Sequence, residues 1–165
     1  MSLEIRPVRK EDVEVVCDLI HELARYERLE SQCKAKPEYL YEELFGPRAV
    51  IDCVLAWEKN EETGFERPVG FALYFFNFST FLTRRGLYLE DLFVVEDARR
   101  KGYGRALIRH LAQKALEEGC GRFDWSVLDW NQPAIDFYEG LGAEVMPDWR
   151  ICRLSGDALL KAAGR

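Results

Sequence analysis

The sequence lacks the residues that metal sites and disulfide frameworks need. It contains only two histidines, His21 and His110, and neither has a second ligand at metal-binding spacing. Its cysteines are odd in number and form no C-x-x-C pair, so reduced, mostly buried thiols in a cytoplasmic protein are expected. The five cysteines are Cys17, Cys33, Cys53, Cys120 and Cys152. No metal cofactor is predicted.

No stretch of the sequence is apolar for long enough to cross a membrane. The longest apolar run, "VGFALYFFNF", is much shorter than the roughly 20 residues that a spanning helix requires. The beginning, "MSLEIRPVRKEDVEVV", carries acids early and has no long apolar stretch, unlike a signal peptide. The net charge of −6 disfavours broad binding to nucleic acid. These features predict no nucleic-acid and no membrane partner, and a small cationic partner fits the charge better.

The length and composition fit one globular domain over residues 1–165, with 48% hydrophobic and 32% charged residues. Apolar spacing predicts strands at 3–6, 50–57, 69–78, 87–95, 123–128 and 150–154. It predicts helices at 12–26, from Pro37 to just before Phe45, at 102–118, from Pro133 with Asn131 as a possible cap, and from Asp157 onward. This order is typical of an α/β (α+β) protein with a mixed sheet and helices on its faces.

A glycine-rich junction follows the strand at 87–95. The segment "RRKGYGR", residues 99–105, leads into a predicted helix. The first N–H groups of a helix are unpaired and glycine lets a ligand approach the backbone, so this junction predicts a phosphate or pyrophosphate site. The P-loop pattern is absent, and the dinucleotide pattern G-x-G-x-x-G fails at Leu107. The alternative interpretation is a solvated basic turn in which the glycines only ease a bend.

Several blocks together resemble the GNAT family of N-acetyltransferases. Arg99 to Gly104 fits R/Q-x-x-G-x-G/A, with which that family grips the pyrophosphate of acetyl-CoA. The block "VLDWNQPAIDFYEGLGAE" resembles a later motif of the family, with Asn near the start of a helix and Tyr near its end. "LARYERLE", "YLEDLFV" and "LDWNQPA" resemble the branch that contains the spermidine/spermine and thialysine acetyltransferases. The resemblance spans most of the chain.

The resemblance implies a fold, an activity and a cofactor. The fold would be a mixed, mostly antiparallel sheet flanked by helices, with a splayed central strand pair that binds acetyl-CoA. The activity would be transfer of acetyl from acetyl-CoA to a primary amine of a small cationic molecule: a diamine, polyamine or thialysine-like compound. The branch also implies a homodimer. Two alternatives stay open: a protein or peptide N-acetyltransferase, and a CoA-binding sensor without turnover.

The resemblance assigns three groups of residues to the coenzyme. Backbone groups of the splayed strand would meet the pantetheine arm, with the N–H of Leu92 as a candidate donor to the oxyanion. The glycine-rich turn would hold the phosphates, and a segment after the last crossover strand would meet the arm from the other side. In chain order the residues are Leu92, Phe93, Val94, Arg99, Arg100, Lys101, Gly102, Tyr103, Gly104, Arg105, Asn131, Pro133 and Ala134.

Acetyl transfer to an amine requires a deprotonated nucleophile and an acid for the leaving thiolate. Freeing an alkylamine of its proton at pH 7 costs roughly 4 kcal/mol. The resemblance makes Tyr138 the general acid. It assigns Glu90 to binding the amine of the substrate and to removing its proton through water. Glu90 and Asp91 are neighbours in a strand and are expected on opposite faces, so only one of them can face a given pocket. The resemblance assigns that place to Glu90. The expected substrate wall comprises Tyr26, Glu27, Glu90, Asp124, Trp125 and Ser126. The structural alternatives are a core aromatic for Tyr138, a solvated strand end for the Glu90–Asp91 pair and an exposed helix end for Tyr26 and Glu27.

The sequence departs from the polyamine enzymes in the loop "NFSTFLTRRGLYLED". Ser79 stands near the place where those enzymes carry an acid, and Arg84 and Arg85 follow. Two cations that face the site would repel a long polyamine. A small primary amine, such as a lysine analogue or a diamine, is therefore expected to be a better substrate than spermine.

Overall fold

The computed structural model describes residues 1–165. A mixed five-stranded sheet lies at the centre of the part of the chain up to Trp125. The strands lie side by side in chain order: β1 (Ser2–Pro7), β2 (Asp52–Lys59), β3 (Glu66–Ser79), β4 (Arg84–Val94) and β5 (Arg122–Trp125). Neighbours from β1 to β4 are antiparallel, and β5 runs parallel to β4. The predicted mixed, mostly antiparallel sheet is confirmed.

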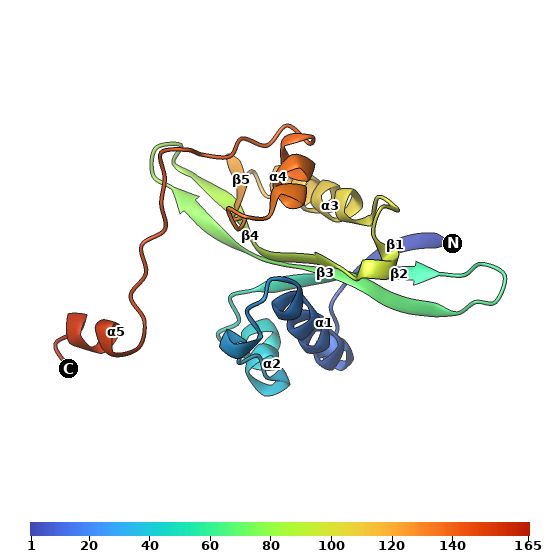
Figure 1. Cartoon of the computed structure of the whole chain (residues 1–165), viewed down its shortest axis with the longest axis horizontal. Coiled ribbons are helices and arrows are strands. Elements are labelled where there is room, and N and C mark those ends of the chain that lie inside the picture. Colours follow the sequence, from blue (N-terminus) through green and yellow to red (C-terminus); the bar gives the residue numbers. More distant parts are fainter. The chain divides into compact units, whose positions relative to one another are not determined.

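Helices cover both faces of this sheet. α1 (Val13–Tyr26) and α2 (Pro37–Phe45) lie on one face, and α3 (Tyr103–Glu117) lies on the other (Figure 1). α3 connects β4 to β5, as the crossover between parallel strands requires. Three single 3₁₀ turns complete this part of the chain: η1 (Lys10–Asp12), η2 (Glu30–Gln32) and η3 (Glu96–Ala98).

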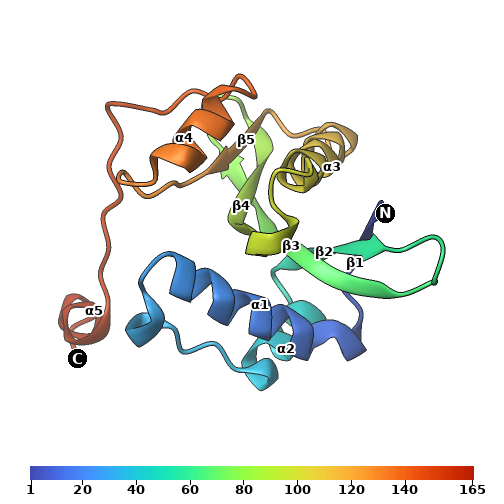
Figure 2. The ribbon, with the colours of Figure 1, turned by 45° about the vertical axis from the view of Figure 1, so that its right-hand side comes forward.

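A hydrophobic core lies between α1 and the sheet. A spacing of three and four residues brings apolar side chains of α1 onto one side of the helix, as predicted. Val16, Leu19 and Leu23 are buried there and belong to one cluster with Phe71 of β3 and Phe93 of β4. Burying side chains of this size stabilises a fold by about 1.5–3 kcal/mol each. This packing fixes the carboxyl-terminal end of α1 beside β4, an arrangement that Figure 2 shows from a second direction.

The chain forms two compact units, Met1–Ser126 and Val127–Arg165, which the structure does not place relative to one another. The second unit contains α4 (Gln132–Glu139) and α5 (Gly156–Ala162). Asn131 caps α4 as predicted, because its side-chain oxygen accepts a hydrogen bond from the backbone N–H of Ala134 at 3.3 Å. The expectation of one domain over the whole chain stays a prediction.

The predicted strand at residues 150–154 is wrong. These residues are exposed and form neither helix nor strand. Their apolar content permits an extended backbone, but a strand needs a partner, and the sheet contains only β1 to β5. The preceding strand is also shorter than predicted, because β5 ends at Trp125 rather than at residue 128.

Three further properties of the chain concern its chemistry. No helix is both long and apolar enough to cross a membrane. No three histidine, cysteine, aspartate or glutamate side chains gather where they could hold a metal ion. All five cysteines are free thiols, of which Cys17 and Cys53 are buried.

Candidate active site

β5 ends partway along β4. They pair only where Gly86–Leu89 lies beside Arg122–Trp125, and β4 then continues as far as Val94. Over this continuation β5 offers no partner, so one edge of β4 presents backbone N–H and C=O groups that an extended ligand can bind. This edge of β4 is where the predicted splayed strand pair would bind acetyl-CoA. Leu92, Phe93 and Val94, which were predicted to meet the pantetheine arm, lie on this continuation.

A register shift at Glu90 changes the face that each side chain of β4 takes. Leu73 of β3 pairs with Asp91 but its neighbour Tyr74 pairs with Leu89, so Glu90 is an extra residue in β4. Because directly paired residues share a face, Leu89 lies with Tyr74, and Asp91 lies with Leu73 on the face that α1 covers. Asp91 is therefore the carboxylate that faces α1, and the assignment of Glu90 to the amine, which came from the resemblance, stays a prediction.

Two carboxylates share a pocket on the α1 face. The pocket has a volume of about 210 Å³ and is lined by Glu27, at the end of α1, and by Asp91. The other lining residues are Ile20, Leu23, Ala24, Leu29, Gln32 and Cys33. Burial raises the pKa of Glu27, while burial and the charges of Glu90 and Glu27 raise the pKa of Asp91 to about 6. A cation in this pocket would relieve both the burial cost and the repulsion between the carboxylates.

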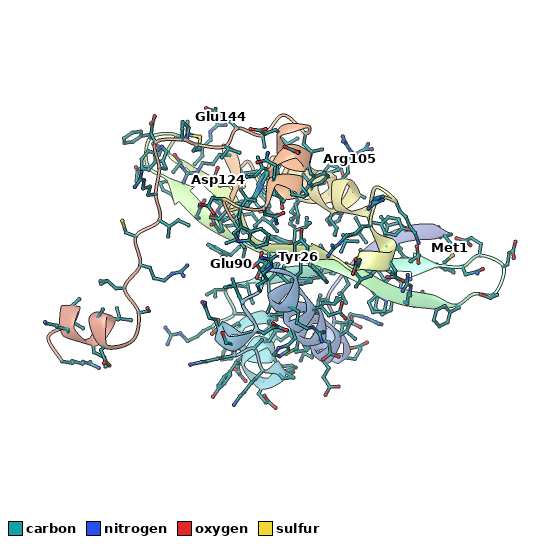
Figure 3. All side chains as sticks on the ribbon, in the orientation of Figure 1. Met1, Tyr26, Glu90, Arg105, Asp124 and Glu144 are labelled. Carbon is teal, nitrogen blue, oxygen red and sulfur yellow. The ribbon has the colours of Figure 1, made fainter.

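Arg99 joins the end of α1 to the end of β4. Its Nε donates a hydrogen bond to the carbonyl oxygen of Val94 at 2.9 Å. Its guanidinium carbon lies 4.5 Å from the ring centre of Tyr26 and 5.5 Å from that of Phe93, which is cation–π geometry. Figure 3 labels Tyr26 and Glu90 in this region, where α1 meets β4. A predicted coenzyme residue, Arg99, therefore contacts a predicted substrate residue, Tyr26.

A histidine ties the segment after α1 back to the helix. Nε2 of His21 lies 3.1 Å from the carbonyl oxygen of Ala35, and Nδ1 lies 3.5 Å from Sγ of Cys33. Because a carbonyl only accepts, Nε2 carries the hydrogen, and in the neutral ring Nδ1 accepts from the Cys33 thiol. These contacts give His21 a structural role, since they fix one of the residues that line the acidic pocket.

The turn at residues 99–105 leads from β4 into α3. Two residues of the turn take the left-handed conformation: Arg100, with φ of 61°, and Gly102, with φ of 84°. Glycine adopts it freely, whereas an ordinary residue does so at a cost of about 1–2 kcal/mol. α3 begins at Tyr103 and no side chain caps its first turn, so its first N–H groups point outward, as an anion site needs. Arg100 and Arg105 are both exposed, and Figure 3 labels Arg105 beside α3.

Lys101 and Tyr103 bind a buried carboxylate of β2. Nζ of Lys101 lies 2.6 Å from Oε1 of Glu58, and the hydroxyl of Tyr103 donates to the same oxygen at 2.7 Å. The guanidinium of Arg67 donates to the other oxygen at 3.1 Å. The hydrogen bonds from Lys101 and Tyr103 lower the pKa of Glu58 to about 2. Two of the predicted coenzyme residues are therefore held by an acid that the sequence analysis did not single out.

The predicted substrate residues of β5 make local contacts. Asp124 forms an ion pair with Arg122 at 2.9 Å. The hydroxyl of Ser126 lies 2.9 Å from that of Tyr88, which links the end of β5 to β4. Trp125 is half-buried beside them. Their contact with a substrate stays a prediction.

Four predicted site residues belong to the second unit: Asn131, Pro133, Ala134 and Tyr138. Pro133 lies in the first turn of α4, and Tyr138 lies in its last turn with its ring centre 5.2 Å from that of Phe137. The structure does not place this unit relative to the first. The approach of these residues to the coenzyme therefore stays a prediction.

The arginines expected to repel polyamines lie at the start of β4. Arg84 and Arg85 are its first two residues, and at about 3.3 Å per residue Arg85 is roughly 20 Å from Asp91. Arg85 also lies 3.8 Å from Glu118. These two cations do not face the acidic pocket, so the expectation that spermine is a poor substrate cannot rest on them.

The sequence analysis did not assign a role to Asp91 or Glu58. Glu58 left a signal in the sequence: it follows Val54 and Ala56 at alternate positions, and all three are buried in β2. An acid on an apolar strand face needs a partner, which is the cue that sequence reasoning could have used. Asp91 left no such signal, because its face depends on the bulge.

Comparisons with known proteins give the chain relatives. The model of the acetyltransferase (GNAT) family matches residues 17–143. Thialysine N-epsilon-acetyltransferase of Sus scrofa is 36% identical over 170 residues, which cover 99% of this chain and 99% of that protein. L-ornithine N5-acetyltransferase of Arabidopsis thaliana is 51% identical over 90 residues, but these are only 54% of this chain and 40% of that protein.

A solved structure is similar over the whole chain. It is an integron cassette protein from the mobile metagenome of V. cholerae, with a TM-score of 0.80 and 30% identity, and the match covers 100% of this chain and 99% of that one. The family match includes β4, the turn at 99–105 and α4. The resemblance stated from the sequence motifs is thereby confirmed.

Proposed function

Because the chain belongs to the acetyltransferase (GNAT) family, we propose that it transfers the acetyl group of acetyl-CoA to the side-chain amine of a small diamino acid. The names of two relatives specify acceptors of this kind, thialysine and L-ornithine. One observation on this chain carries the proposal: Glu27 and Asp91 line one pocket of about 210 Å³. A pocket with two carboxylates suits the ammonium end of an aminoalkyl chain.

The electrostatics of this pocket favour the charged form of an amine. Burial raises the pKa of both acids, so each carboxylate is held in a setting that penalises its negative charge. An ammonium group between Glu27 and Asp91 would supply the missing positive charge and bring both pKa values down again. The same attraction raises the pKa of the bound amine, so binding alone does not provide the neutral nucleophile.

Proton removal is the role that we give to Asp91, with Glu90 beside it. Asp91 has a pKa of about 6 when no cation lies beside it, and it regains this basicity as the ammonium gives up its proton, so it is a stronger base than an ordinary aspartate. Glu90 is exposed and adjacent, so it can pass the proton from the pocket to water. The neutral amine then attacks the thioester carbonyl, and the N–H of Leu92 stabilises the oxyanion.

Acetyl-CoA supplies the acetyl group as a thioester. The backbone of Leu92, Phe93 and Val94 binds the extended arm, and the first turn of α3 with Arg100 and Arg105 binds the diphosphate. The proposed contacts with the arm also include three residues of the second unit: Asn131, Pro133 and Ala134. Tyr138 donates its phenolic proton to the leaving sulfur.

We expect an amine screen to rank diamino acids first. Pure protein, acetyl-CoA and a panel of thialysine, ornithine, lysine, putrescine, spermine and an amino-terminal peptide would be compared by thiol release. Thialysine or ornithine should give the highest kcat/KM, because each carries a primary amine on a short chain that fits the pocket. Cadaverine and 5-aminopentanoate serve as matched controls for the α-amino and carboxylate groups.

Other rankings would contradict the proposal in distinguishable ways. A peptide that outperforms every small amine would indicate a protein acetyltransferase. Spermine in first place would indicate a polyamine enzyme. Binding of acetyl-CoA without thiol release for any amine would indicate a coenzyme sensor.

We expect Asp91→Asn to weaken amine use and to stabilise the protein. Loss of one carboxylate partner should raise the KM for the amine roughly 10- to 100-fold. The folded-state pKa of Asp91 lies above its unfolded value, so its ionisation opposes folding as the pH rises from about 4 to 6. Asparagine removes this cost, and stability at pH 7 should rise by roughly 1–3 kcal/mol.

Thermal unfolding at pH 4 and pH 7 checks the second effect. The gain over the wild type should be present at pH 7 and should shrink toward pH 4, where the carboxyl group of the wild type is protonated. Asp18→Asn is the matched control, because Asp18 is an exposed aspartate of α1. An unchanged amine KM together with an unchanged Tm would contradict this role of Asp91.

We also propose a cytoplasmic homodimer. Five free thiols suit a reducing compartment. Apolar side chains of the second unit are exposed over residues 145–160, and a second copy of the chain would cover them: Val145, Met146, Trp149, Ile151, Leu154, Leu159 and Leu160. Light scattering on the eluting protein would show twice the chain mass, and a single chain mass at micromolar concentration would contradict it.

A further inference from the structure

A buried carboxylate on β2 binds the two residues that flank the glycine in the turn before α3. Glu58 is 1% exposed, and its Oε1 accepts hydrogen bonds from Lys101 at 2.6 Å and from Tyr103 at 2.7 Å. Lys101 and Tyr103 flank Gly102 directly. One oxygen atom of a distant strand therefore fixes the residue before and the residue after the left-handed glycine.

The same carboxylate is tied to the other end of the turn. Its Oε2 accepts from Arg67 of β3 at 3.1 Å, and Arg67 also forms an ion pair with Asp97 at 2.8 Å. Asp97 lies in η3, the short turn that links β4 to Arg99. The network thus spans the whole approach to α3, from η3 to the first residue of the helix.

The turn holds a conformation that an unsupported chain would avoid. Arg100 has φ of 61°, which is unfavourable for a residue other than glycine. On one side Arg99 is anchored by its hydrogen bond to the carbonyl of Val94, and on the other side Lys101 is anchored to Glu58. Between these two anchors Arg100 is kept left-handed and its guanidinium is exposed.

We propose that Glu58 is a positioning residue for the coenzyme, and this rests on the proposed function. Glu58 is buried and does not itself reach a bound molecule; it acts by fixing the turn so that the first N–H groups of α3 are oriented before the diphosphate arrives. A site that is already in its bound conformation loses less entropy on binding. Lys101 serves as the inner anchor and neutralises Glu58, while Arg100 and Arg105 supply the outward positive charge.

The inference separates coenzyme affinity from the other steps of the reaction. A positioning role predicts that loss of the Glu58 charge weakens acetyl-CoA binding and leaves the amine pocket, which is lined by Glu27 and Asp91, unaffected. A purely structural ion-pair network would instead lower Tm without a selective effect on the coenzyme. The two roles therefore differ in whether the KM for acetyl-CoA rises.

The test is Glu58→Gln, which keeps the shape of the side chain and removes its charge. Isothermal titration with CoA and steady-state assays with acetyl-CoA would be compared with the wild type. We expect the Kd for CoA and the KM for acetyl-CoA to rise about 10- to 100-fold, with the amine KM and the saturated kcat within about threefold of the wild type. Glu66→Gln is the matched control, because Glu66 pairs with Arg6 on the same sheet and should leave coenzyme affinity unchanged.

Two milder variants keep the inference testable if Glu58→Gln does not fold. Tyr103→Phe and Lys101→Met each remove one donor to Glu58, and each should weaken CoA binding by several fold. Coenzyme affinity within twofold of the wild type in the folded variants would overturn the inference. Failure of the wild-type protein to bind CoA would overturn the proposed function as well, whereas normal wild-type binding with unaffected variants would overturn the inference alone.

Discussion

Replacing Tyr138 with phenylalanine should lower kcat about 100- to 10,000-fold, the range over which general acids contribute. The change removes one oxygen atom and keeps the aromatic ring that lies 5.2 Å from Phe137 in the last turn of α4. α4 should therefore stay folded, since its cap at Asn131 and its ring contact are both retained. The lost group is the phenolic O–H that protonates the leaving sulfur.

The affinity for CoA shows whether Tyr138→Phe affects only the chemical step. Titration should give a Kd within about twofold of the wild type, because the diphosphate and the arm bind elsewhere. Tyr39→Phe, in an exposed tyrosine of α2, is the matched control and should leave kcat unchanged. A variant of Tyr138 that retains full kcat would show that the sulfur leaves without help from this phenol.

Reversing two charges at the start of α3 should produce the second large effect. Arg100→Glu with Arg105→Glu should raise the Kd for CoA about 100- to 1,000-fold, because each change removes one attraction to the diphosphate and adds one repulsion. Both residues are exposed, so the fold does not depend on them. The wild-type affinity itself should fall between 0.05 and 0.5 M salt, because exposed charges are screened.

One more arginine of α3 provides the control for this double variant. Arg109 is exposed and lies one helical turn beyond Arg105. Arg109→Glu should change the Kd by less than about threefold, because the effect of a helix end falls off within its first turn. An equal loss of affinity in Arg109→Glu would contradict a local diphosphate site. It would indicate that the overall positive charge of α3 attracts the coenzyme.

Local patterns predicted most of the fold. The apolar stripe of α1, the proline at the start of α2, the asparagine cap of α4 and the strand-to-helix turn at 99–105 each depend on residues close in sequence, and all are present. The strand predicted at 150–154 failed because strand formation depends on a partner elsewhere in the chain. Sequence spacing carries no information on that partner.

The candidate site was harder to predict from the sequence than the fold. The motif at 99–104 identified the turn but not the acid that holds it, because Glu58 lies on β2, far away in the chain. Likewise "YLED" identified the two carboxylates but not which one enters the pocket. That choice depends on the pairing of β3 with β4, and Asp91 takes the place because of a single unmatched residue.

The bulge also has a consequence for how this strand tolerates change. In the sequence, every second residue from Leu87 to Phe93 forms one regular series: Leu87, Leu89, Asp91 and Phe93. In the structure, the first two of these side chains lie on one face of the sheet and the last two lie on the other. Substitution at Glu90 keeps the extra residue, whereas excision of the same position would join Leu89 directly to Asp91. Neighbouring residues of a regular strand point to opposite faces, so Asp91 and Phe93 would keep Leu73 and Phe71 as partners and stay on the α1 side. We therefore expect the loss of this single codon to leave both the acidic pocket and the core side chain in place.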